Sequence, residues 1–212
     1  QTTSRAWWSY EMLETLGLPD RLDDHVGEFV NGKEVFDKEG IIGQLDAGLE
    51  IATKKDNVIQ YAFADAQNAT GFFAQWDEGA GYSTFSEAQR EAAREAVEYW
   101  DDLVAPTFVE VNGTGGADIV YANTSTGPAQ AWAYYPNGKG TPYFKHIASD
   151  VWIATPDVNG SNGQLDDGFY GLNTLVHETG HSLGHSHPGD YNFSDDNDGD
   201  GQPDPITYEA DA

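Results

Sequence analysis

The stretch that decides the fold lies at residues 177–187 and reads HETGHSLGHSH. Four of the six histidines in the chain fall within it, a concentration that structural uses of histidine rarely produce. On a helix, His177 and His181 lie one turn apart on the same face, so each can give an imidazole nitrogen to one metal ion. The spacing therefore predicts a metal centre built on a helix.

A third ligand requires the helix to end. An uninterrupted helix would carry His185 about 12 Å along the axis from His177, which is too far to share one ion. Gly184 can adopt a left-handed conformation and turn the chain back, so that His187 approaches the other two imidazoles. We therefore predict a zinc ion held by His177, His181 and His187, with a fourth position open for catalysis. His185 is expected to face solvent or to support a ligand.

Glu178 follows the first of these histidines directly and projects in a different direction. It is therefore expected to reach a water molecule on the metal, and not the metal itself, which suits a general base. Two other interpretations remain open at this point. The histidines could be ordinary surface or core residues without a metal, or the metal could be bound without catalysis.

Strands and helices are predicted around this segment from hydrophobic periodicity. Ser86 with Gln89 three positions later indicates a capped helix that ends before Pro106. The expected apolar face of this helix consists of Ala93, Ala96, Val97, Trp100 and Leu103. Asn173 is the expected cap of the histidine-bearing helix. A further helix is expected around residues 5–16, and an extended segment at 70–76. Strands are predicted at residues 58–63, 107–111, 118–122, 131–135 and 151–154.

The composition excludes several classes of partner. With 36 acidic against 10 basic residues, the formal net charge is −26, so neither nucleic acid nor an anionic membrane surface is an expected partner. No apolar run is long enough to cross a membrane. The chain has no cysteine, and an exported protein without disulfides needs another source of stability, for which bound metal is a common solution.

The acidic run at residues 195–204 has the spacing of a calcium loop over its first nine positions. Thr207 stands where such loops carry a bidentate glutamate, so the alternative of a solvated acidic loop stays open. The candidate calcium ligands are Asp196, Asp198, Asp200 and Asp204.

The histidine motif continues as PGDYN at residues 188–192, and residues 130–136 read QAWAYYP. Across roughly residues 55–192 the chain resembles the serralysin-type bacterial metalloproteases of the metzincin superfamily. The resemblance implies an α+β, zincin-like metzincin catalytic domain. We expect a twisted, mixed five-stranded sheet with a long crossover helix and an active-site helix.

The resemblance also implies a secreted zinc-dependent endopeptidase that cleaves extended polypeptides with Glu178 as the base. A peptide substrate would add as an antiparallel strand along a sheet edge. On alternation alone, an aromatic strand packing on the core is an equally good interpretation. The candidate substrate-binding residues are Ala131, Trp132, Ala133 and Tyr134.

The sequence departs from the family pattern after the third histidine. The family places a methionine-containing turn and a tyrosine there, but the only methionine is Met12, and no glycine-rich repeat is present. We expect a truncated enzyme whose partner is the missing C-terminal part of the same enzyme. The alternative is a non-catalytic zinc- and calcium-binding domain, or an inactive autolytic fragment.

The expected organisation has three parts. Residues 1–50 form an N-terminal helical extension, and residues 51–188 form an upper catalytic subdomain with the zinc-binding helix. Residues 189–212 form the incomplete start of a lower subdomain with the acidic loop.

Overall fold

The structure, a computed structural model, describes residues 26–30, 33–53, 56–65, 79–127, 129–136 and 147–187. The chain divides into two compact units, one at residues 46–186 and one formed by residues 1–45 with 187–212. In the second unit, β1 (Phe29–Val30) pairs antiparallel with β2 (Lys33–Glu34), and α2 (Lys38–Leu45) follows. The helix predicted at 5–16, the extended segment at 70–76 and the acidic loop at 195–204 lie outside the described residues.

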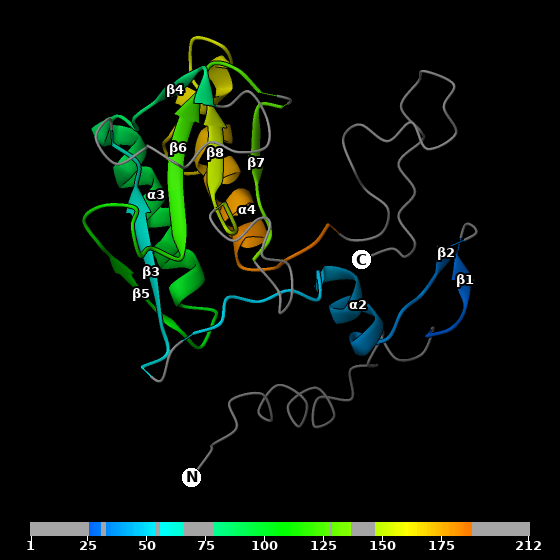
Figure 1. The fold of residues 1–212 in the computed structure, drawn as a ribbon. Helices are drawn as coiled ribbons and strands as arrows, with labels where there is room; N and C mark the ends of the chain where they lie inside the picture. Colours follow the sequence, from blue (N-terminus) through cyan, green and yellow to red (C-terminus); the bar gives the residue numbers. More distant parts are fainter. Residues whose placement is uncertain are drawn as a thin grey trace. The chain divides into compact units, whose positions relative to one another are not determined.

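The larger unit is built on a mixed sheet of six strands (Figure 1). The strand order is β5-β3-β6-β8-β7, and β4 pairs with β6. The strands β5, β3, β6 and β8 run parallel to one another, whereas β7 is antiparallel to β8 and β4 is antiparallel to β6. The bounds are β3 (Val58–Phe63), β4 (Tyr82–Ser83), β5 (Thr107–Glu110), β6 (Ile119–Thr124), β7 (Ala131–Ala133) and β8 (Val151–Ala154).

The predicted α+β class is confirmed, and each of the five predicted strands is present to within a few residues. The prediction of five strands is wrong by one, because β4 completes a sheet of six. Two residues are too few for hydrophobic alternation, so only the pairing of Tyr82 with Thr124 and of Ser83 with Asn123 identifies this strand. β7 ends at Ala133, two residues before the predicted end.

Helix α3 (Glu87–Asp101) begins with the predicted capping box. The Gln89 amide donates to the Ser86 hydroxyl at 3.2 Å, and the Ser86 amide donates to the Gln89 side chain at 3.0 Å. The Gln89 and Asn123 side-chain amides then exchange two hydrogen bonds of 2.9 Å, which fix the start of the helix to β6. The helix ends before Pro106, as predicted, but Leu103 follows the helix and is 76% exposed, so it does not extend the apolar face.

Helix α4 (Tyr170–Ser182) carries the histidine motif and lies beside α3 on one face of the sheet (Figure 1). The core between helices and sheet includes Tyr61 and Tyr121 from the strands and Leu175 from α4. The opposite face of the sheet carries a second cluster, in which Trp132 stacks on the fully buried Trp152 with ring centroids 6.2 Å apart. None of the helices in the described part of the chain is long and apolar enough to cross a bilayer.

The prediction that Asn173 caps α4 is wrong. The helix begins three residues earlier, at Tyr170, and its N-cap is Phe169, which makes no side-chain cap hydrogen bond. The preceding turn supplies the acceptor instead, because the Gly171 amide donates to the Gln164 carbonyl at 2.9 Å. A backbone acceptor from a neighbouring turn leaves no signature in the residue type at the cap.

Candidate metal centre

Helix α4 ends in a Schellman motif centred on Gly184. Gly184 has a φ of 103°, its amide donates to the His181 carbonyl at 3.0 Å, and the His185 amide donates to the Gly180 carbonyl at 3.0 Å. The predicted end of the helix at Gly184 is therefore confirmed. A side chain at this position would be strained by the positive φ, and its Cβ would also collide with the Leu49 carbonyl oxygen.

A segment from before the sheet packs against this turn. The Ala47 amide donates to the Gly184 carbonyl at 3.0 Å, and Asp46 forms an antiparallel β-bridge with His185. No sequence pattern indicates this contact, because the two segments are separated by almost the whole of the larger unit. The consequence is that this segment holds the exit of the histidine helix in place.

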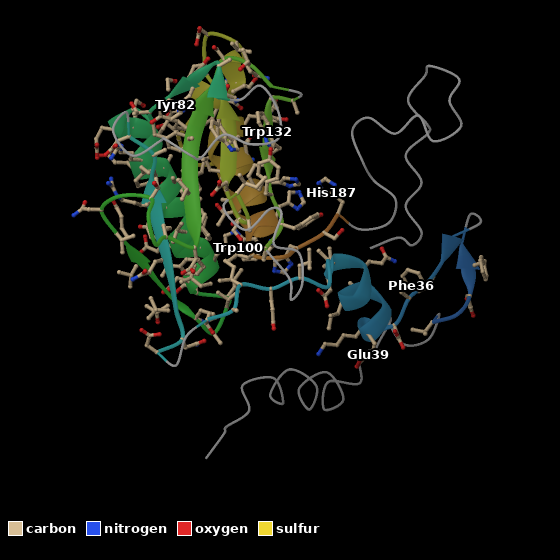
Figure 2. The ribbon with its side chains drawn as sticks, viewed as in Figure 1. Phe36, Glu39, Tyr82, Trp100, Trp132 and His187 are labelled. Carbon is tan, nitrogen blue, oxygen red and sulfur yellow. The ribbon has the colours of Figure 1, made fainter. Side chains whose placement is uncertain are left out.

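The structure brings together the three histidines predicted as zinc ligands. Each of His177, His181 and His187 offers a ring nitrogen, and these atoms all lie within 4.8 Å of one another. The Nε2 atoms of His177 and His181 are 3.0 Å apart, and a tetrahedral zinc ion with bonds near 2.0–2.1 Å separates two ligand nitrogens by about 3.4 Å. His187 is labelled in Figure 2, and His185 is not part of the group.

A backbone contact defines which nitrogen of His181 carries the proton. Its Nδ1 lies 2.6 Å from the His185 carbonyl oxygen, which can only accept. The contact is therefore a hydrogen bond when Nδ1 is protonated, and in the neutral ring this leaves the lone pair on Nε2. The ring of Tyr135 also contacts His181 edge-to-face, with centroids 5.8 Å apart. His181 is thus held in the tautomer that can ligate a metal through Nε2.

Glu178 is buried, with 7% of its surface exposed, and its Oε2 has no hydrogen-bond partner among the residues that the structure describes. Burial raises the pKa of this carboxyl to about 8, because desolvation penalises the charged form. A nearby cation acts in the opposite direction and favours the carboxylate. Three converging imidazoles, one of them next in sequence to a buried carboxyl, match the residue types found at catalytic zinc sites, so these residues fit a zinc ion.

The site helix is joined to the sheet by a buried pair of hydroxyl groups. The Tyr121 hydroxyl lies 2.9 Å from the Thr179 hydroxyl, which donates to the Leu175 carbonyl at 2.7 Å. Because the Thr179 proton is used in that second bond, Tyr121 is the donor in the first. This chain of bonds fixes the residue that follows Glu178 against β6.

The site helix is also joined to α3, through Trp100. The indole nitrogen of Trp100 donates to the Val176 carbonyl at 2.9 Å. The ring of Trp100, which is labelled in Figure 2, packs on Gly180, where a Cβ would lie 2.8 Å from the indole Cζ2. The centroids of the Trp100 and His185 rings are 4.9 Å apart. The sequence showed Trp100 only as part of an apolar helix face, and no local signal connects it to the metal centre.

The candidate substrate strand is an edge strand. β7 stands last in the strand order, and among the described strands it pairs only with β8. Ala131 and Ala133 pack toward the helices, while Trp132 and Tyr134 pack on the opposite cluster. Substrate binding by these four residues stays a prediction. So does calcium binding by Asp196, Asp198, Asp200 and Asp204, which lie outside the described residues.

Comparison with known proteins identifies relatives of this chain. It is 31% identical to metalloprotease AprA of Pseudomonas entomophila over 183 residues, which is 82% of this chain and 36% of that protein. It is 33% identical to serralysin A of Dickeya chrysanthemi over 189 residues, 81% of this chain and 36% of that protein. The chain is a relative of the serralysin-type metalloproteases.

A further match, to metallopeptidase AprA of Pseudomonas marginalis, has 38% identity over 114 residues and covers 53% of this chain and 23% of that protein. The chain thus spans between 23% and 36% of the length of these three serralysin-type relatives. No protein-family model matches the chain.

Proposed function

We propose that this chain carries the catalytic zinc centre of a secreted endopeptidase that hydrolyses extended polypeptides. The observation that carries the proposal is the convergence of three imidazole nitrogens within 4.8 Å, next in sequence to a buried glutamate. The named relatives, which are metalloproteases and serralysins, support the same function. None of them supports a non-catalytic metal-binding domain.

The roles of the residues follow from their chemistry. His177, His181 and His187 would hold the zinc ion, which when bound acts as a Lewis acid and makes water easier to deprotonate. Glu178 would accept a proton from the attacking water and pass it to the leaving amine. The burial of Glu178 excludes bulk water from its carboxyl, so the proton would be retained for transfer to the amine.

Substrate binding would use the edge of β7 with which none of the described strands pairs. An extended peptide that adds antiparallel to this edge can form main-chain hydrogen bonds with residues 131–134 without reading the peptide's side chains. The Tyr135 ring, which contacts His181, stands where β7 meets the histidine site. This arrangement would place the main chain of a bound peptide beside the metal centre.

The decisive experiment is Glu178→Gln, which keeps the size of the side chain and removes its ability to accept a proton. We expect azocasein hydrolysis to fall by a factor of at least about 100, while one zinc per chain is retained. Glu91→Gln, at an exposed position on α3, is the matched control and should keep full activity. Full activity in zinc-loaded Glu178→Gln would refute the mechanism.

A further inference from the structure

The C-terminal end of α4 lacks a side chain where Schellman motifs commonly have an apolar contact. In this motif, the residue after the glycine usually packs on the residue three positions before the cap. Here these two positions are His185 and Gly180, and Gly180 has no side chain to offer. The Trp100 ring from α3 contacts both of them instead.

Trp100 is anchored independently of these two contacts. Its indole nitrogen donates to the Val176 carbonyl, one turn before Gly180 in the same helix. A planar ring that is hydrogen-bonded at one edge cannot slide along the helix without breaking that bond. Trp100, a residue of α3, therefore holds the His185 ring in a fixed position relative to the backbone of α4.

The backbone of His185 contacts His181, one of the three candidate metal ligands. Its own amide is bonded to the Gly180 carbonyl, and its carbonyl oxygen accepts from Nδ1 of His181 at 2.6 Å. A partner that orients a ligand imidazole through its second nitrogen fixes both the tautomer and the direction of the first. Displacement of the His185 backbone would therefore release the His181 ring.

We propose that Trp100 and His185 form a positioning pair for the metal centre: the contact between their two rings, which are tilted by 33° to each other, fixes the helix exit, and the His185 carbonyl orients His181. Neither residue ligates the metal in this arrangement. The inference rests on the proposed function, since it assigns these residues a role toward the zinc site. It adds two positions that the HExxHxxGxxH pattern does not define.

The test measures zinc affinity of the whole chain by competition with a chromophoric chelator. Trp100→Phe removes the hydrogen bond to Val176 and shortens the ring, and His185→Ala removes the ring that contacts Trp100, at an exposed position. Each should weaken zinc binding roughly 10-fold. His185→Phe restores an aromatic surface that cannot ligate a metal, and should bind zinc within about twofold of the unaltered protein.

A spectroscopic measurement separates positioning from general loss of stability. The absorption bands of bound Co²⁺ report ligand geometry, and they should shift in Trp100→Phe and His185→Ala and remain unchanged in His185→Phe. Trp152→Phe is the matched control, because it shortens a fully buried indole on the other face of the sheet. It should lower stability without changing the zinc affinity or the Co²⁺ bands.

The outcomes distinguish this inference from the proposed function. Tight zinc binding in both Trp100→Phe and His185→Ala overturns the positioning pair and leaves the zinc site intact. An equal loss of affinity in Trp152→Phe, or a loss in His185→Phe as large as in His185→Ala, overturns it as well. Absence of zinc binding in the unaltered protein overturns both proposals.

Discussion

The Tyr121 hydroxyl on β6 donates a hydrogen bond of 2.9 Å to the Thr179 hydroxyl on α4, across 58 positions of sequence, and both side chains are fully buried. The two partners are not equivalent, because Thr179 also donates to the Leu175 carbonyl. Loss of Thr179 therefore leaves the Tyr121 hydroxyl without this partner, whereas loss of Tyr121 leaves Thr179 bonded to Leu175.

This asymmetry gives a quantitative prediction for two single variants. Tyr121→Phe removes one hydrogen bond and leaves Thr179 bonded to Leu175, so it should destabilise the protein by about 0.5–1.5 kcal/mol. Thr179→Val leaves the Tyr121 hydroxyl buried with no acceptor, which should cost about 1–3 kcal/mol. Urea unfolding of both variants and of the double variant measures the coupling. If the two effects simply add in the double variant, the hydroxyl pair does not join the helix to the sheet.

Gly180, in the last turn of the site helix, is predicted to be required for packing. A Cβ at Gly180 would lie 2.8 Å from the Trp100 ring, so Gly180→Ala should destabilise the protein by about 1–2 kcal/mol, although alanine favours helix. Gly43→Ala in α2 is the matched control, since nothing lies within 4 Å of the added atom. That substitution should be neutral or stabilising. The opposite order of the two melting temperatures would contradict the proposed contact.

Zinc stoichiometry tests the choice among the histidines. His187→Ala should leave less than one zinc per chain after dialysis, because only two imidazoles remain. His185→Phe should retain one zinc per chain, since His185 is not part of the ligand group. Metal content is measured by atomic absorption on the folded protein. A reversal of these results would mean that His185, and not His187, is the third ligand.

The Arg94–Glu110 pair predicts a pH dependence of stability. Hydrogen bonding from Arg94, at 2.7 Å, lowers the pKa of the Glu110 carboxyl below its ordinary value. As the pH falls, Glu110 is therefore protonated in the unfolded chain before it is protonated in the folded protein. The contribution of the pair to the free energy of unfolding is complete above the ordinary carboxyl pKa. It is lost as the pH falls through the lower pKa that Glu110 has in the folded protein. Both side chains are partly exposed, so the contribution should stay below about 1 kcal/mol.

The measurement for this pair compares the unaltered protein with Arg94→Met in urea from pH 7 to pH 3. The difference in unfolding free energy should shrink as the pH falls, and 1 M salt should reduce it at pH 7. A difference that is independent of pH would indicate that Arg94 acts through packing alone.

Calcium binding by the acidic loop remains a prediction from its spacing. If Asp196, Asp198, Asp200 and Asp204 hold calcium, the protein treated with EDTA and then given zinc alone should melt below the protein given zinc and calcium. The same comparison is made on a variant in which Asp198 and Asp200 are changed to Asn, because these substitutions remove the negative charge of two candidate ligands. Equal melting temperatures in the unaltered protein would support the solvated loop instead.

The sequence was sufficient for those parts of the site that depend on spacing along one helix. The four-residue spacing of His177 and His181 places their imidazoles on one face of the helix. Gly184 ends the helix, because a residue with a positive φ is needed there to turn the chain back. Trp100 was not predictable as a neighbour of the site, because its contact with Val176 spans 76 positions and depends on how two helices pack. Nor was β4, since a strand of two residues is defined by its partner and not by its own pattern.

The β-bridge between Asp46 and His185 also has a consequence for how the protein folds. Its two members stand at opposite ends of the larger unit, so this pairing closes a loop that contains the entire sheet. Contacts of such long sequence separation form slowly, because the entropy of loop closure opposes them until the intervening chain is ordered. During synthesis, the exit of the histidine helix can gain this support only after the ribosome has released the whole unit. The ability of the chain to bind a metal ion should therefore appear late in folding, after the sheet has already formed.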